Sequence, residues 1–204
     1  MHTLYSMQNS GNCYKLRLAM AQLGIPFQIH DVDILKGESR TPEFLALNPN
    51  GKVPALRLET GELLAESNAI LFFLAEDTPL MPEGKFCRAE MLQWMFFEQY
   101  SHEPYIAVAR FWLKLMKGGR ELKRDMLDDW WERGYEALGV MERHLESHDF
   151  FAAGQYSIAD IALYAYTHVA EDGEFDLSDF PRVNAWMERV QDQPGHVPMD
   201  WRPK

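Results

Sequence analysis

The sequence lacks a long apolar stretch and is poor in positive charge. No hydrophobic run approaches the roughly 20 residues that a membrane-spanning helix needs. The first residues also lack the basic-then-apolar pattern of a signal peptide. The 20 Lys and Arg residues are outnumbered by 31 Asp and Glu residues, and the net charge of −11 argues against nucleic acid or an anionic membrane as the main partner. These absences predict a cytoplasmic protein that binds neither.

Cysteine is scarce as well, since only Cys13 and Cys87 occur, far apart in the chain. This usage predicts a reducing compartment rather than a disulfide framework. The sequence has no metal-ligand cluster and no phosphate-binding glycine loop, so no metal is expected. What is present is a globular composition with 47% hydrophobic residues, enough to build a buried core in one large or two small domains.

Strand and helix signals alternate over residues 1–77, which predicts an α/β domain. We expect these elements in chain order: a strand over 3–6, a helix from Ser10 to Gly24, a strand over 27–33, a helix over 42–47, a hairpin over 53–65 and a helix over 68–76. The expected helices begin and end with residues that are typical of helix termini, such as the Thr41 N-cap followed by proline.

The rest of the chain carries only helix signals. Residues 78–86 contain two prolines and a glycine and are expected to be a linker, and residues 87–204 an all-helical domain. Pro104 should kink or break a long helix over 88–116. Ser157 and Asp160 predict a capping box, which makes Asp160 a structural residue rather than a catalytic one.

The loop Ser10-Gly11-Asn12-Cys13 is the strongest functional signal. It follows a strand and opens a helix, so backbone N–H groups and the positive end of the helix dipole lie beside it and favour a thiolate. Its spacing is that of a C-x-x-C redox motif with serine first, which suggests that a small molecule supplies the missing thiol. The sequence alone favours an ordinary N-cap for Ser10, and for Cys13 it favours a small buried residue over a reactive thiol.

Four motifs in this order resemble the cytosolic glutathione transferases, over essentially the whole chain. They are residues 10–17, 48–56, 66–70 and 157–160. The first resembles the serine-type, theta-like N-terminal motif of bacterial members. The resemblance implies a thioredoxin-like α/β N-terminal domain and an all-α C-terminal bundle. It also implies glutathione as co-substrate, and a homodimer.

The resemblance further implies roles for residues of the first domain. Ser10 would donate its hydroxyl to the glutathione sulfur, helped by Asn12. The residues implied to contact glutathione are Gly11, Cys13, Arg40, Lys52, Val53, Pro54, Glu66 and Ser67. Among these, a cis Val53–Pro54 bond would let the Val53 backbone pair with glutathione, and Glu66 and Ser67 would bind its γ-glutamyl group.

An aromatic-rich stretch around Pro104 is the candidate lining for an electrophile pocket. Tyr105, Arg110 and Phe111 are the residues we expect there, although aromatics at helical spacing are more often core. His102, in the same stretch, is expected to be a structural histidine.

The function expected from this resemblance is a glutathione transferase that adds an ionised glutathione thiol to a small hydrophobic electrophile. One alternative is a glutathione-dependent disulfide reductase or peroxidase on the same scaffold. The other is a non-enzymatic interaction module that has kept the fold without the chemistry.

Overall fold

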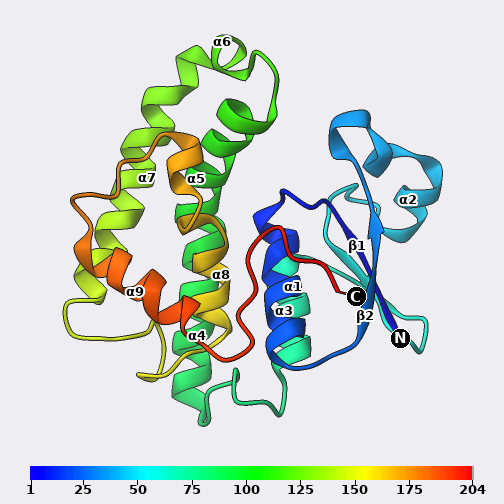
Figure 1. The fold of residues 1–204 in the computed structure, drawn as a ribbon, viewed down its shortest axis with the longest axis horizontal. Coiled ribbons are helices and arrows are strands. Elements are labelled where there is room, and N and C mark those ends of the chain that lie inside the picture. The colour runs from blue at the N-terminus through cyan, green and yellow to red at the C-terminus, as the bar shows by residue number, and fades with distance from the viewer. Residues whose placement is uncertain (204) are drawn as a thin grey trace. The chain divides into compact units, whose positions relative to one another are not determined.

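A computed structural model describes residues 1–203, and they form two compact units (Figure 1). The first unit comprises residues 1–78 together with residues 194–203, and the second comprises residues 79–193. Within the described residues, no helix is both long and apolar enough to cross a membrane.

The first unit is built on a mixed four-stranded sheet. Its strands are β1 (His2–Ser6), β2 (Phe27–Asp31), β3 (Ala55–Arg57) and β4 (Leu63–Ala65), in the spatial order β2-β1-β3-β4. The central strand β1 runs parallel to β2 and antiparallel to β3. Leu4 in β1 lies opposite Ile29 and Leu56, which places apolar residues in the middle of the sheet. The expected thioredoxin-like α/β domain is therefore confirmed.

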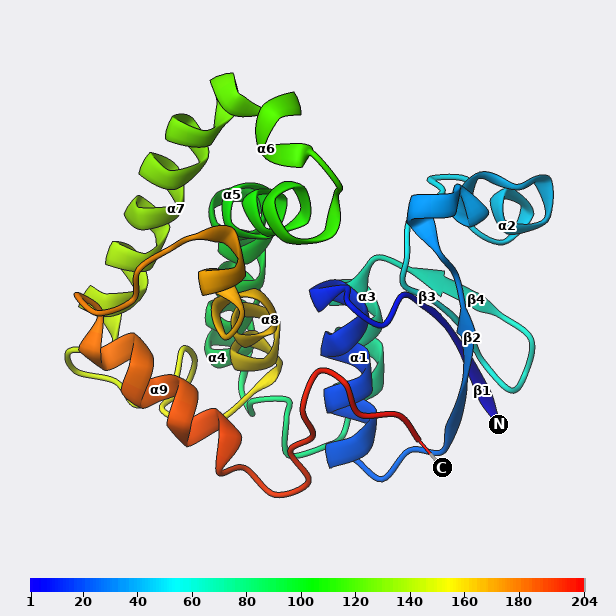
Figure 2. The same cartoon turned by 45° about the horizontal axis from the view of Figure 1, so that its top comes forward.

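The described part of this unit also has three α-helices, α1 (Gly11–Gln22), α2 (Pro42–Leu47) and α3 (Ser67–Ala75), and two short 3-10 helices, Ile34–Lys36 and Glu38–Arg40. Figure 2 shows α1 and α3 side by side on one face of the sheet. The sequence predicted one apolar face for α1, but the helix is buried on nearly every side. Even Lys15 and Arg17 have no exposed surface.

The last residues of the chain depart from the expected domain boundary, because residues 194–203 group with the sheet unit rather than with the helices. In Figure 2 this segment, drawn in red, runs beside α1. The hydroxyl of Tyr14 donates to the Val197 carbonyl oxygen (2.7 Å), and a guanidinium nitrogen of Arg17 donates to that of Met199 (2.8 Å). Extended backbone after a helix leaves carbonyl groups unpaired, and side chains of the first unit satisfy them here.

The second unit is all-helical, as expected. Its α-helices are α4 (Lys85–Phe97), α5 (Glu103–Arg110), α6 (Gly119–Leu122), α7 (Arg124–His144), α8 (Ile158–Thr167) and α9 (Pro181–Gln191). Helix α4 packs against α8, and α5 packs against α7. Pro104 was expected to kink or break a long helix over 88–116, and the regular α-helix is interrupted just before it: a π-helical turn, Glu98–His102, separates α4 from α5, and Pro104 lies in the first turn of α5.

The predicted capping box at the start of α8 is confirmed. The Ser157 side chain accepts from the Ala159 N–H (3.3 Å), while an Asp160 carboxylate oxygen accepts from the Ser157 N–H (2.9 Å). The second Asp160 oxygen accepts from the Phe151 N–H and the Trp186 indole N–H. Asp160 thus connects α8 with α9 and with the loop that precedes α8.

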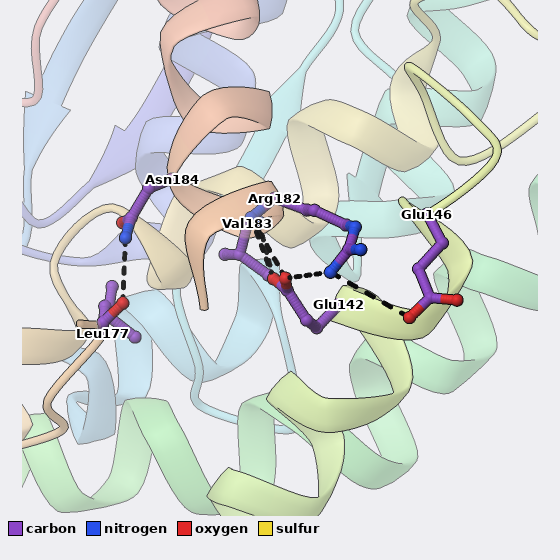
Figure 3. A network of polar contacts seen from close by, with 6 residues as sticks. All are labelled: Glu142, Glu146, Leu177, Arg182, Val183 and Asn184. Carbon is purple, nitrogen blue, oxygen red and sulfur yellow. Dashed lines mark hydrogen bonds and ion pairs between the residues drawn. The ribbon is translucent and has the colours of Figure 1, made fainter. Parts of the chain in front are cut away.

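Glu142 in α7 acts as a cap for another helix, the N-terminus of α9 (Figure 3). Its carboxylate accepts from the N–H groups of Arg182 (3.1 Å) and Val183 (3.0 Å) and from the Arg182 guanidinium (3.1 Å). Glu146, four residues further along and just past the end of α7, lies 3.9 Å from the same guanidinium and is mostly exposed. The first residue of α9 is a proline, so Glu142 satisfies two of the remaining backbone donors of this turn.

Glu142→Ala should therefore lower the free energy of unfolding by about 2 kcal/mol, because it removes an acceptor from two backbone N–H groups and from a guanidinium. Glu146→Ala is the matched control and should lower it by less than about 0.5 kcal/mol, as expected for an exposed ion pair. Urea unfolding of the two variants measures the difference. Equal losses would show that Glu142 does not cap α9.

Candidate functional site

The loop between β1 and α1 has the geometry that its sequence predicted. Ser10 is the N-cap of α1, and its hydroxyl oxygen accepts from the Cys13 N–H (3.3 Å). A serine hydroxyl that accepts one hydrogen bond still has its own hydrogen to donate. Ser10 and Asn12 are both half-buried. The capping role and the sulfur-donating role of Ser10 are therefore compatible.

Cys13 has a different environment from the one that a glutathione contact requires. Its side chain is fully buried, and its Sγ accepts from the Met7 N–H (3.4 Å). Burial raises the pKa of the Cys13 thiol, although a hydrogen bond with Ser10 acts in the opposite direction. Cys13 is thus a small buried residue, and its side chain has no exposed surface with which to contact glutathione, contrary to the expectation.

The start of α3 brings two further predicted residues to the same place. The Ser67 hydroxyl donates to the Asn12 side-chain oxygen (3.1 Å), which joins the first turns of α1 and α3. Glu66 precedes α3 with a positive φ of 67° and an exposed side chain. Two positive helix ends therefore meet beside an exposed carboxylate, an arrangement that suits a ligand carrying both negative and positive charge.

Lys15 is a residue of this site that the sequence did not reveal. Its ammonium donates to the Ser67 hydroxyl oxygen (3.3 Å) and to the Asn68 side-chain oxygen (3.1 Å). A lysine within a helix normally predicts an exposed position. Its partners lie more than 50 residues further along the chain, so no local pattern could have identified it.

The loop before β3, residues 48–54, contributes the next residues of the candidate site. Asn48 holds it in a turn, since its side-chain nitrogen donates to the Lys52 carbonyl oxygen (2.8 Å). The Val53–Pro54 peptide bond is cis, as the resemblance implied. The Lys52 side chain is exposed.

Asn50, from the tip of the same loop, links two predicted residues. Its side-chain nitrogen donates to a Glu66 carboxylate oxygen (3.4 Å), and its carbonyl oxygen accepts from the Arg40 guanidinium (3.1 Å). Arg40 also lies directly over Gly51, where a Cβ atom would be 2.4 Å from the guanidinium. Arg40 is thereby held at this loop rather than extended freely into solvent.

The residues expected to line an electrophile pocket lie in the second unit. Arg110 is only 5% exposed, and its Nε donates to Asp172 (3.1 Å), so its guanidinium serves an internal ion pair. Tyr105 and Phe111 are half-buried, and Tyr105 lies under the Arg133 guanidinium. A hollow of about 410 Å³ in this unit is lined by residues 121–126 and contains none of them.

His102 is confirmed as a structural residue. It is fully buried, and its Nε2 lies 2.9 Å from the Thr167 hydroxyl. Over residues 1–203, no group of three or more His, Cys, Asp or Glu side chains is arranged to hold a metal ion.

Comparison with known proteins gives the family. Residues 9–77 match the model of the glutathione S-transferase N-terminal domain, and residues 91–194 match that of the C-terminal domain. The chain belongs to the glutathione S-transferase family. It is an enzyme of this family rather than an interaction module that has kept only the fold.

Three relatives show how closely the chain follows the family. A crystal structure of a possible glutathione S-transferase from Rhodopseudomonas palustris is 60% identical, with a TM-score of 0.97 over 100% of this chain and 91% of that one. A glutathione transferase from Burkholderia graminis, solved with two glutathione molecules bound per subunit, is 32% identical, with a TM-score of 0.82 over 95% and 85%. The disulfide-bond oxidoreductase YfcG of Escherichia coli is 30% identical over 90% of this chain and 87% of its own.

Proposed function

We propose that this protein binds glutathione on its sheet unit, ionises the thiol beside Ser10 and adds the thiolate to a small hydrophobic electrophile. The Ser67–Asn12 hydrogen bond carries this proposal, because it brings the N-termini of α1 and α3 to one place. The α1 end would stabilise the thiolate, and the α3 end the γ-glutamyl carboxylate, with Glu66 accepting from the ammonium. The glutathione-bound relative from Burkholderia graminis supports this ligand.

The reaction needs no covalent enzyme intermediate. The bound thiol loses its proton to solvent, the sulfur forms a bond to the electrophilic carbon, and the leaving group departs with its electron pair. The protein contributes by holding the two reactants together and by stabilising the thiolate before attack. In the helical unit we retain Tyr105 and Phe111 as electrophile contacts and omit Arg110, which is engaged with Asp172.

The serine-type assignment of this site is tested by titrating glutathione into the wild type and three Ser10 variants while thiolate absorbance is followed across pH. Ser10→Ala and Ser10→Asn should both return the thiol pKa of bound glutathione toward its ordinary value of about 8.5, with about a tenfold loss of conjugation rate at neutral pH. Ser10→Thr should keep the wild-type behaviour because it keeps the hydroxyl.

The asparagine variant separates catalysis from capping, since asparagine is a good N-cap without a hydroxyl. Only Ser10→Ala should also lower stability, by about 1 kcal/mol. An equally depressed thiol pKa in all four proteins would transfer the role to Asn12 and the helix end. Absence of glutathione binding by the wild type would exclude the proposed function.

A second candidate is glutathione-dependent disulfide reduction, favoured by the similarity to YfcG. A bound thiolate would attack one sulfur of a substrate disulfide and release the other as a thiolate. A second glutathione thiolate would then attack the glutathione sulfur of the mixed disulfide, which forms oxidised glutathione and releases the remaining substrate sulfur as a thiolate. Because Cys13 is fully buried, this route would use glutathione alone. Turnover of a small disulfide that survives in Cys13→Ser would support it.

We also propose a homodimer and a cytoplasmic location. Three aromatic side chains on α4 and the π-helical turn after it are strongly exposed: Phe86 (80%), Phe96 (69%) and Tyr100 (83%). Exposed aromatics concentrated on one stretch of the chain are typical of an interface between subunits. Cys13 and Cys87 are both free thiols, which fits a reducing compartment.

A further inference from the structure

A lysine with no exposed surface is unusual, and here it lies in the wall of the proposed glutathione site. Lys15 is 0% exposed, in the first half of α1. Its ammonium donates to the Ser67 hydroxyl oxygen (3.3 Å) and to the Asn68 side-chain oxygen (3.1 Å), both in the first turn of α3. A buried charge is retained only where polar groups replace its water, and these two contacts help to hold the ammonium in place.

The lysine also determines the direction of the hydrogen bonds that follow. An ammonium group can only donate, so the Ser67 oxygen must act as acceptor toward it. The hydroxyl hydrogen is then directed to Asn12, whose side-chain oxygen lies 3.1 Å away. That oxygen faces Ser67, and the Asn12 NH2 group therefore faces the opposite side.

We propose that Lys15 is a positioning residue of the glutathione site, which orients the Ser67 hydroxyl and through it the Asn12 amide. This inference rests on the proposed function, in which the N-terminus of α1, with Asn12, stabilises the glutathione sulfur, and the backbone N–H groups at the N-terminus of α3, with that of Ser67, bind the γ-glutamyl carboxylate. The Lys15 ammonium would then orient groups at both the sulfur and the γ-glutamyl carboxylate of the bound glutathione. A chain of donors that points one way from Lys15 to Asn12 makes the Asn12 NH2 group a fixed donor toward the sulfur.

The charge of Lys15 adds to this orienting effect. Both groups that glutathione would place nearby, the thiolate and the γ-glutamyl carboxylate, are negative. A positive charge enclosed by protein acts through a lower effective dielectric constant than one in water, and dissolved salt screens it less. Lys15 should therefore affect an anionic ligand more than an exposed lysine does.

The test compares Lys15→Met, which keeps most of the length of the side chain without its charge, with Lys117→Met at an exposed lysine of the helical unit. Thiolate absorbance of saturating glutathione is followed across pH for each protein, together with the conjugation rate. We expect Lys15→Met to shift the midpoint of thiolate formation upward and to lower the rate near neutral pH about tenfold. Lys117→Met should match the wild type.

A second variant keeps the test decisive if Lys15→Met does not fold. Ser67→Ala alone interrupts the same chain of hydrogen bonds and should shift the midpoint in the same direction. If Lys15→Met folds, the double variant should shift the midpoint no further than the larger single effect. A purely structural Lys15 would lower stability and leave the midpoint at saturation unchanged, which would overturn the proposal, as would an unshifted Ser67→Ala. If the wild type bound no glutathione, the proposed function would fail as well.

Discussion

Replacing Asp160 with alanine should lower the free energy of unfolding by at least about 3 kcal/mol near pH 7. The fully buried carboxylate accepts from the Phe151 N–H (3.1 Å), the Trp186 indole N–H (3.0 Å) and the Ser157 N–H (2.9 Å). Alanine leaves these donors without this acceptor, and each unsatisfied buried donor costs about 1–3 kcal/mol. Activity per folded molecule should be retained, because Asp160 serves the helical core.

The difference between the wild type and this variant should grow as the pH falls. Burial raises the pKa of Asp160 to about 6, from an ordinary value of 3.8, so the folded protein binds this proton more tightly than the unfolded chain. The resulting stabilisation is complete below the unfolded pKa and is lost as the pH rises through about 6. From about pH 7 to about pH 5, the difference should widen by about 1.4 kcal/mol.

Urea unfolding over this pH range measures both effects. Asp179→Ala removes an exposed aspartate from the same unit and should change stability by less than about 0.5 kcal/mol. A comparable loss in the two variants would contradict the capping role of Asp160. An Asp160→Ala protein that folds but has lost activity would contradict the assignment of Asp160 as a structural residue.

Arg17→Met should cost about 3 kcal/mol and loosen residues 194–203. The guanidinium has no exposed surface and donates to the Ser6 hydroxyl (3.1 Å) and to the carbonyl oxygens of Gln8 (2.8 Å) and Met199 (2.8 Å). Burial lowers the pKa of Arg17 through loss of hydration. Methionine fills most of the space but leaves these acceptors without their donor.

Hydrogen exchange of residues 196–201 and chemical unfolding together check this result. Arg202→Met is the matched control, because Arg202 fastens the same segment to Asp31 (2.8 Å) through an exposed ion pair. It should cost less than about 1 kcal/mol. If the control loosened the segment as much as Arg17→Met does, the surface pair would be its main attachment.

Most of the architecture could be predicted from local patterns. Ser10, Thr41 and Ser157 are N-caps in both sequence and structure, because capping depends on residues within one helical turn. Pro104 marked the break between α4 and α5 for an equally local reason. The C-terminal boundary could not be predicted, since it depends on bonds from residues 8–17 to residues 197–199.

In the candidate site too, residues that belong to short motifs could be predicted, and residues that depend on distant partners could not. Glu66 and Ser67 belong to a short motif and could be found in the sequence, and the structure joins Ser67 to Asn12. Lys15 and Arg17 resemble ordinary exposed charges within a helix, and only distant partners reveal their burial. Arg110 was expected to face a substrate, but Asp172, 62 residues further along, engages it.

The return of residues 194–203 to the first unit affects how the chain folds during synthesis. A ribosome delivers residues 1–78 first, yet the carbonyl groups of Val197 and Met199 that complete the surroundings of α1 emerge only after residues 79–193. While the helices of the second unit are synthesised, Tyr14 and Arg17 therefore lack the Val197 and Met199 carbonyl groups as partners. Contacts between residues 194–203 and α1 can form only after both of these parts of the chain have been synthesised.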